Sequence, residues 1–341
     1  MRPRVTELVH RPVTGLTHRL TPLALVVALA LPLAACGLGS GGSVPLAVGP
    51  GSIQPVPGLE GVQLTVGSKD FTEQIILGYI AEFALQAAGA AVRDLTNIQG
   101  SNSARAALTS KQIDLQWEYT GTAWINYLGN TEPIPGTQQQ YDAVKEADAA
   151  NGITWTDLAP LDNTYALAVN QKNAAALGVK TVSDYAALVA SDPSKATTCL
   201  ETEFASRPDG FPGLGQAYGF NSAAAPTQIL ATGAIYQATA DATPCVFGEV
   251  FTTDGRVLGL DLKVLTDDKQ FFPRYNAAIT LRTSIGKAHP EIAEVLAPIA
   301  AKLDTATITR LNARADVDGV EQAQVARDWL VEEGFVTNPN A

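Results

Sequence analysis

The residues best suited to binding chemistry lie together in 114–124, where an apolar–polar alternation typical of a strand changes at Gly121 to a helical spacing. A strand that runs into a helix leaves backbone N–H groups and a hydroxyl, here from Thr120 or Thr122, directed at one point that suits an anion. Tyr119 ends the strand and offers a ring face that attracts a cation. The stretch predicts a pocket for a zwitterion, although an ordinary strand–helix junction with a buried tyrosine also explains it.

Alternating strand and helix patterns must position this stretch. Strand patterns at 63–67, 92–95 and 114–119 alternate with helix patterns around 75–87 and 102–110. Such an order predicts a parallel sheet with right-handed crossovers, and hence an α/β fold. Ligands of these sheets sit at the carboxyl ends of the strands, which is where the third strand ends in an aromatic residue.

The later strands predict two lobes. Strand patterns at 165–170 and 257–264 are expected to be the two crossings between them. One lobe would comprise 62–169 together with 258–341, and an inserted lobe would comprise 170–257. A cleft between the lobes would then hold the ligand.

Charge and histidine content exclude several classes of function. The 341 residues carry a formal net charge of −11, which argues against nucleic acid as a partner because its phosphates would be repelled. Only His289 follows Cys36, so the chain beyond that cysteine has no histidine cluster. We therefore expect no metal site, no cofactor and no His-based catalysis.

The first residues have the pattern of an export signal. Residues 1–35 run from a basic segment through an apolar segment to small residues, which is typical of a signal peptide. Leu-Ala-Ala before Cys36 resembles a bacterial lipobox, so Cys36 is the expected lipidation site of an extracytoplasmic, membrane-anchored lipoprotein; a secreted protein with an incidental cysteine is the alternative. The Gly-, Ser- and Pro-rich segment 36–61 is expected to be a flexible tether.

Two more cysteines fall in the inserted lobe. Cys199 and Cys245 are expected to form a disulfide because an exported protein meets an oxidising compartment. Two free buried thiols, or a redox or metal role, are the alternatives, but no CxxC motif or nearby histidine supports the latter.

Six short motifs, collinear at suitable spacings, give the chain a family resemblance. It resembles the ProX/OpuC-type substrate-binding proteins of osmoprotectant ABC transporters, which take up glycine betaine, carnitine or choline. The resemblance implies a two-lobed periplasmic-binding-protein (type II) fold with a double hinge crossing and a central cleft, in agreement with the lobes expected above. The motifs are GSKDFTEQ at 67–74, EYTGT at 118–122, YALA at 165–168, EFASRPDG at 203–210, TDGR at 253–256 and FPRYN at 272–276.

The resemblance implies an aromatic cage for a quaternary ammonium group. The matching positions are Tyr119, Tyr165 and Tyr275, with Phe251 where the family usually has a fourth tyrosine. Phenylalanine keeps the ring face and loses the hydroxyl, so the cage should be retained but weaker. Asn163 stands where a family member can have an aspartate, and this loss of charge makes ligands without a carboxylate, such as choline, less expected.

The resemblance also implies donors for the carboxylate of a betaine. The matching positions are Lys69, Thr122 and Arg207. An arginine can hold a carboxylate through two parallel hydrogen bonds. Glu118 is expected to be a surface or hinge charge.

The sequence therefore predicts a monomeric solute-binding lipoprotein, not an enzyme, that captures a glycine betaine-like osmoprotectant and delivers it to an ABC permease. Three alternatives remain: the same role with another ligand, such as choline or carnitine; an exported hydrolase of choline esters or lipids; and a binding lobe that serves a sensor or adhesin. The chain has no GxSxG motif, which disfavours the hydrolase.

Overall fold

A computed structural model of the chain describes residues 42–340. The predicted signal peptide 1–35 and the predicted lipidation site Cys36 lie outside the described residues. The fold is α/β, as predicted, with two larger sheets and a two-stranded ribbon. None of the helices in 42–340 combines the length and apolar character of a membrane span.

The first sheet has six strands in the order β1-β4-β3-β5-β12-β6. Its centre is parallel, because β3 pairs in the same direction with both β4 and β5. The predicted strand–helix alternation at the start of the chain is thus confirmed, and β12 returns antiparallel to β5 and β6. The strands are β1 (Gly42–Ser43), β3 (Gln63–Lys69), β4 (Ala91–Ile98), β5 (Leu115–Tyr119), β6 (Ile153–Asp162) and β12 (Asn276–Arg282).

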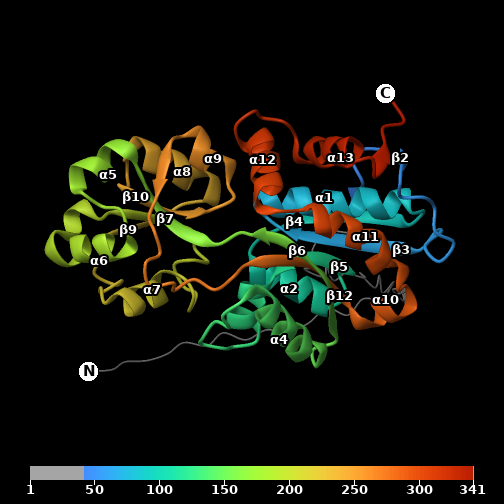
Figure 1. Cartoon of the computed structure of the whole chain (residues 1–341), viewed down its shortest axis with the longest axis horizontal. Coiled ribbons are helices and arrows are strands. Elements are labelled where there is room, and N and C mark those ends of the chain that lie inside the picture. Colours follow the sequence, from blue (N-terminus) through green and yellow to red (C-terminus); the bar gives the residue numbers. More distant parts are fainter. Residues whose placement is uncertain (1–41, 341) are drawn as a thin grey trace, which may run out of the picture. The chain divides into compact units, whose positions relative to one another are not determined.

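Helices cover both faces of this sheet (Figure 1). Helices α1, α11, α12 and α13 lie on one face with α1 in the middle, and α2 and α4 lie on the other. Leucine, isoleucine, phenylalanine and alanine side chains of α1 are buried along most of its length, which makes it the central helix of the larger core. These helices are α1 (Thr72–Ala87), α2 (Ser101–Thr109), α3 (Thr120–Thr122), η1 (Ala123–Tyr127), α4 (Thr137–Ala149), α10 (Thr283–Ala288), α11 (Glu291–Lys302), α12 (Thr305–Asp316) and α13 (Gln322–Glu332).

The second sheet has five strands in the order β11-β7-β10-β8-β9 and forms the other lobe. Helix α8 packs on one face of it, and α6 and α7 enclose the other. Its strands are β7 (Tyr165–Asn170), β8 (Thr198–Leu200), β9 (Thr227–Ile229), β10 (Phe247–Phe251) and β11 (Leu262–Val264). Its helices are α5 (Gln171–Leu177), α6 (Val182–Ser191), η2 (Pro193–Lys195), α7 (Phe211–Tyr218), α8 (Thr232–Asp241) and α9 (Gly255–Gly259).

The two crossings between the lobes differ from the predicted boundaries. Strand β7 pairs with β10 and β11 along its length, so the first predicted crossing strand lies inside the second sheet. The second, 257–264, is the end of a helix, 255–259, followed by the short strand β11 of the same sheet. The chain instead crosses between β6 and β7, at 163–164, and again between β11 and β12, at 265–275. The predicted inserted lobe 170–257 was therefore too short at both ends, because a strand that leaves a hinge looks the same in sequence whichever sheet it joins.

The tether predicted for 36–61 is wrong over its described part, 42–61. Strand β2 (Gly49–Pro50) pairs with β13 (Val336–Thr337), and the N–H of Ile53 donates to the carbonyl of Phe335 at 3.0 Å. The Leu59 side chain is fully buried, and that of Ile53 is 7% exposed. A few isolated apolar residues hold this Gly- and Pro-rich segment on the first lobe, and they leave no periodic signal.

The predicted disulfide is confirmed: Cys199, in β8, is bonded to Cys245, just before β10. Strands β8 and β10 are parallel neighbours, with Cys199 opposite Gly248. The bond therefore links adjacent elements of the second lobe that are 46 positions apart in the chain.

Candidate ligand pocket between the lobes

A cavity of about 70 Å³ lies between the two lobes. Both lobes and the crossings contribute side chains to its lining. They are Lys69, Asp70, Phe71, Gln99, Gly100, Ser101, Tyr119 and Thr122 from the first lobe, Asn163 and Tyr275 from the crossings, and Tyr165, Glu201, Glu203, Thr232, Glu249 and Phe251 from the second lobe.

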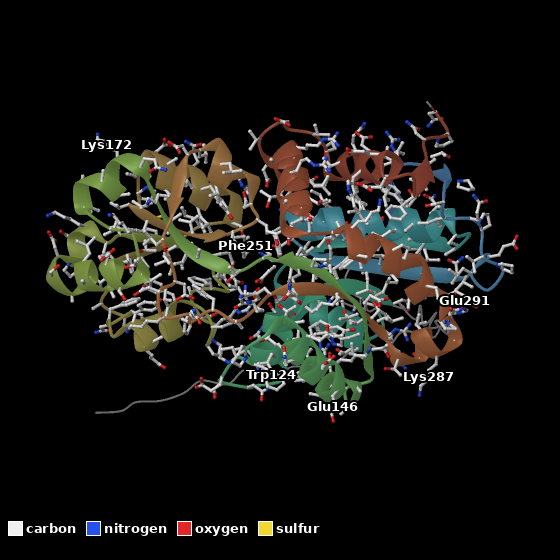
Figure 2. All side chains as sticks on the ribbon, viewed as in Figure 1. Trp124, Glu146, Lys172, Phe251, Lys287 and Glu291 are labelled. Carbon is white, nitrogen blue, oxygen red and sulfur yellow. A yellow bond between two sulfur atoms is a disulfide. The ribbon has the colours of Figure 1, made fainter. Side chains whose placement is uncertain are left out.

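The structure brings all four predicted cage residues to this cavity. The ring centroid of Tyr165 is 5.2 Å from that of Phe251 and 5.5 Å from that of Tyr275, and the latter pair meets edge to face. Phe71, which the sequence analysis did not single out, fills the remaining side: its ring is 4.8 Å from Phe251 and 6.2 Å from Tyr119. Five rings thus surround one small space, and Phe251 lies at the junction of the lobes (Figure 2).

Strand pairing explains why these rings meet. In the antiparallel pair β7–β10, Tyr165 lies directly opposite Phe251. In the pair β5–β12, Tyr119 lies opposite Ala277, so Tyr275, two residues earlier and on the same side of the chain, reaches the end of β5. Each pair brings the ends of its strands to the junction, and the predicted strand–helix transition after Tyr119 is confirmed by α3.

The hydroxyl group of each of the three cage tyrosines forms a hydrogen bond with another side chain of the protein. Each ring is therefore fixed in orientation by a hydrogen bond and can present its apolar face to the cavity. The partners are Glu73 Oε1, which accepts from Tyr119 at 2.8 Å, Asp209 Oδ2, which accepts from Tyr275 at 2.6 Å, and Arg207 Nη1, which donates to Tyr165 at 3.3 Å.

Lys69 lines the cavity, but its ammonium group is paired within the protein. Lys69 Nζ lies 2.5 Å from Glu118 Oε1 and 5.0 Å from the centroid of the Tyr119 ring. The prediction that Glu118 is a surface or hinge charge is wrong, because its side chain is 1% exposed. Gly67 pairs with Gln116 in the parallel strands β3 and β5, and two residues further on Lys69 and Glu118 meet at the ends of those strands.

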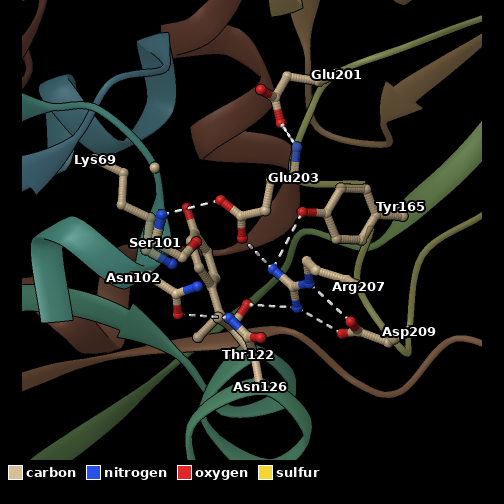
Figure 3. A network of polar contacts seen from close by, with 12 residues as sticks. Lys69, Ser101, Asn102, Thr122, Asn126, Tyr165, Glu201, Glu203, Arg207 and Asp209 are labelled. Atoms are coloured by element: carbon tan, nitrogen blue, oxygen red, sulfur yellow. Dashed lines mark hydrogen bonds and ion pairs between the residues drawn. The ribbon is translucent and has the colours of Figure 1, made fainter. Parts of the chain in front are cut away.

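Arg207 lies behind the lining and is likewise paired (Figure 3). Its guanidinium donates to both carboxylate oxygens of Asp209, at 2.7 and 2.6 Å, and to Glu203 Oε1 at 2.6 Å. It reaches the cavity through the hydroxyls of Tyr165 and Thr122, the latter at 3.4 Å. Burial alone would raise the pKa of Glu203, but the positive charges of Arg207 and Lys69 outweigh it and hold that pKa below its usual range.

A buried carboxylate next to the cavity connects the lobes. Besides the Tyr119 hydroxyl, Glu73 Oε1 accepts from Asn163 Nδ2 at 3.0 Å, and Glu73 Oε2 accepts from Thr253 Oγ1 at 2.5 Å and from Asn312 Nδ2 at 2.9 Å. Glu73 belongs to the first lobe and Thr253 to the second. Four donors thus converge on one carboxyl group, and burial raises its pKa.

Close backbone contact adds to this connection. Helices α9 and α12 come from different lobes, and a Cβ atom at Gly255 would lie 2.3 Å from the Cα of Ala313, so only glycine fits there. On the other side of the cavity, the backbone N–H of Ser101 donates to Glu203 Oε2 at 2.9 Å. The two lobes therefore contact each other on both sides of the cavity.

Two α/β lobes that are joined by two crossings and enclose a small aromatic cavity define a solute-binding protein that can close on its ligand. Residues 62–332 match the family described as "Substrate binding domain of ABC-type glycine betaine transport system". The chain belongs to this family, so it is a substrate-binding protein and not an enzyme. The predicted alternative of an exported hydrolase is therefore set aside.

Individual relatives agree with this assignment. The chain is 38% identical over 283 residues to the glycine-betaine-binding protein of Pseudomonas aeruginosa, a match that covers 82% of this chain and 90% of the relative. It is 32% identical over 284 residues to the ergothioneine transport permease/ergothioneine binding protein EgtU of Helicobacter pylori, of which it spans 49%, with 82% of this chain covered.

Solved structures agree in fold. A glycine betaine/carnitine/choline ABC transporter structure superimposes with a TM-score of 0.64 at 25% identity, covering 80% of this chain and 99% of that one. Apo YehZ from Escherichia coli superimposes with a TM-score of 0.59 at 29% identity, covering 80% of this chain and 99% of that one. The predicted two-lobed fold is thereby confirmed.

Proposed function

We propose that this protein captures a small quaternary-ammonium osmolyte, with glycine betaine as the reference ligand, between its lobes and delivers it to an ABC permease. The observation that supports this most directly is the convergence of aromatic rings from both lobes on one cavity of about 70 Å³. A cavity of this size admits only a small solute. The P. aeruginosa relative, a glycine-betaine-binding protein, agrees with this proposal.

The rings suit a quaternary ammonium because that group has no N–H to donate to a carboxylate. Ring faces attract it electrostatically, and each desolvated face contributes about 0.5–2 kcal/mol. In this proposal Tyr119, Tyr165, Phe251 and Tyr275 form the cage, with Phe71 as a fifth wall. Because the tyrosine hydroxyls are already bonded, the cage is organised before the ligand arrives.

The acid group of a betaine would meet Lys69 and Thr122, which line the cavity, and Arg207 through Thr122. Lys69 and Arg207 are already paired, so a ligand carboxylate would share these two donors with Glu118 and Asp209. The Thr122 hydroxyl accepts from Arg207 and would donate its own proton to the ligand. Asn163 also lines the cavity and would contact the ligand from the crossing.

Ligand contacts with both lobes would stabilise the closed arrangement of the lobes. In this proposal the permease recognises that closed form. We propose that this happens outside the cytoplasm, with the monomeric protein anchored by a lipid on Cys36. A disulfide between Cys199 and Cys245 accords with an oxidising compartment. The export signal at 1–35 and the lipidation are tested by mass spectrometry of the membrane fraction, in which Cys36→Ser should abolish the lipidated species.

Isothermal titration calorimetry tests the ligand class. Glycine betaine, choline, carnitine and ergothioneine form the panel, and at least one should bind with a micromolar Kd, corresponding to about −8 kcal/mol. Tyr119→Ala should weaken that binding at least about tenfold because it removes a ring face. Tyr119→Phe is the matched control and keeps the ring. Absence of heat with every quaternary ammonium ligand would overturn the proposal.

A further inference from the structure

The first turn of helix α1 lies where the two lobes meet. Phe71, directly before the helix, places its ring 4.8 Å from Phe251 of the second lobe and 6.2 Å from Tyr119 of the first. Two residues further on, Glu73 is 2% exposed and does not line the cavity. One short segment therefore supplies a ring to the cavity wall and a carboxyl group behind that wall.

The four donors to the Glu73 carboxyl group fall into two pairs. Oε1 accepts from the hydroxyl of Tyr119 at 2.8 Å and from Asn163 Nδ2 at 3.0 Å, and both of these residues line the cavity. Oε2 accepts from Thr253 Oγ1 at 2.5 Å and from Asn312 Nδ2 at 2.9 Å, and neither residue lines it. One oxygen thus serves the pocket, and the other serves the contact between the lobes.

Thr253 connects this carboxyl group to the second lobe. It is fully buried, and its carbonyl also accepts from Asn312 Nδ2 at 2.9 Å. The N–H of the preceding residue, Thr252, donates to the carbonyl of Thr164 in the crossing at 3.0 Å. Phe251, the cage ring of the second lobe, lies two residues before Thr253. The contacts of this short segment therefore set where that ring stands relative to the first lobe.

We propose that Glu73 is a positioning residue that couples closure of the lobes to the orientation of the Tyr119 ring. In the closed arrangement Thr253 holds Oε2, which fixes the plane of the carboxyl group and presents Oε1 to the Tyr119 hydroxyl. Opening moves Thr253 away, so a buried oxygen loses a donor and the carboxyl group can rotate. The bond therefore stabilises the closed arrangement, and the organised cage depends on it. This inference rests on the proposed function and adds a residue that acts on the ligand without touching it.

Thr253→Val tests the arm from the second lobe, because it removes one donor to Glu73 and keeps the shape of the side chain. In isothermal titration with glycine betaine, or with whichever panel ligand the wild-type protein binds, it should raise the Kd about three- to tenfold. Thr253→Ser keeps the hydroxyl and should restore the affinity. Thr239→Val is the matched control: Thr239 is also fully buried in the second lobe, its hydroxyl donates within its own helix to the carbonyl of Ile235, and its replacement should leave the Kd unchanged.

A double-mutant cycle separates coupling from a general loss of packing. Tyr119→Phe removes the other arm, so in that background Thr253→Val should have less than half of its effect on the free energy of binding. Additive effects of the two substitutions would overturn the inference, and so would equal effects of Thr253→Val and Thr239→Val.

Small-angle X-ray scattering tests the lobe contact without any ligand. The radius of gyration of Thr253→Val should exceed that of the wild-type protein, and that of Thr239→Val should not. Identical scattering of Thr253→Val and the wild-type protein would overturn the inference. If no ligand of the panel binds the wild-type protein, the proposed function fails, and the scattering contrast still decides whether Glu73 and Thr253 hold the lobes closed.

Discussion

Glu82 offers a quantitative test of the electrostatics of the first lobe. Its side chain is fully buried in α1, and it forms no ion pair within residues 42–340. Burial, together with the negative charge of Asp94, raises the pKa of Glu82 from an ordinary value of 4.5 to about 10. The folded protein therefore holds Glu82 protonated at neutral pH, whereas the unfolded chain has it ionised.

The magnitude follows from this difference in protonation. Folding takes up one proton at every pH between the two values, and each pH unit above 4.5 costs about 1.4 kcal/mol. At pH 7 the accumulated cost is about 3.4 kcal/mol. The sign is that of a raised acid pKa: stability is complete below the unfolded value and falls as the pH rises toward the folded value. Gln has the shape of the protonated glutamic acid and cannot ionise, so Glu82→Gln removes the cost.

Urea denaturation followed by circular dichroism measures this effect. We expect the free energy of unfolding of Glu82→Gln to exceed that of the wild-type protein by about 3.4 kcal/mol at pH 7 and by almost nothing at pH 4.5. Other buried acids, such as Glu73 and Glu249, titrate in both proteins and cancel in the difference. A difference that is the same at pH 4.5 and pH 7 would refute the assignment of a protonated Glu82.

Two further predictions concern the cage and the second lobe. Phe71→Leu keeps an apolar side chain and removes a ring face, so it should raise the Kd of the bound quaternary ammonium about 2- to 30-fold in calorimetry. The control is Phe271→Leu, which changes a half-buried ring outside the cavity and should leave that Kd unchanged. Equal effects of the two substitutions would contradict the role of Phe71. Replacing Cys199 and Cys245 by serine removes a disulfide between residues 46 positions apart and should lower the free energy of unfolding by about 4 kcal/mol, measured by urea denaturation. An unchanged urea midpoint would contradict a stabilising disulfide.

Periodic segments were predictable from the sequence. The strand–helix alternation that leads to Tyr119 has long apolar patterns, and the structure has the expected order from β3 to β5. The cage positions were predicted from family motifs rather than from periodicity. An aromatic residue that lines a ligand cage and one that packs in a core give the same strand pattern in the sequence. The motifs placed Tyr165 and Phe251 in the same site, and pairing of β7 with β10 sets them opposite each other.

Features that depend on distant contacts were not predictable. Glu118 alternates with apolar residues as a surface charge would, and its burial follows from Lys69 on the neighbouring strand. Phe71 and Glu73 lie in the GSKDFTEQ motif, from which the sequence analysis assigned only Lys69 to the site. No local sequence pattern shows that helix α1 begins at the cavity. The place of Glu249 in the cavity lining could have been suspected from its position two residues before Phe251, but which side of β10 faces the cavity is set by packing between the lobes.

A crystal structure of the protein with choline bound, together with one grown in glycine betaine, is the most direct test of the aromatic pocket. The account predicts that the ligand nitrogen lies within about 6 Å of the ring centroids of Tyr119, Tyr165, Phe251 and Tyr275. A ligand that is well ordered elsewhere, with these rings packed on one another and the space between them closed, would contradict it.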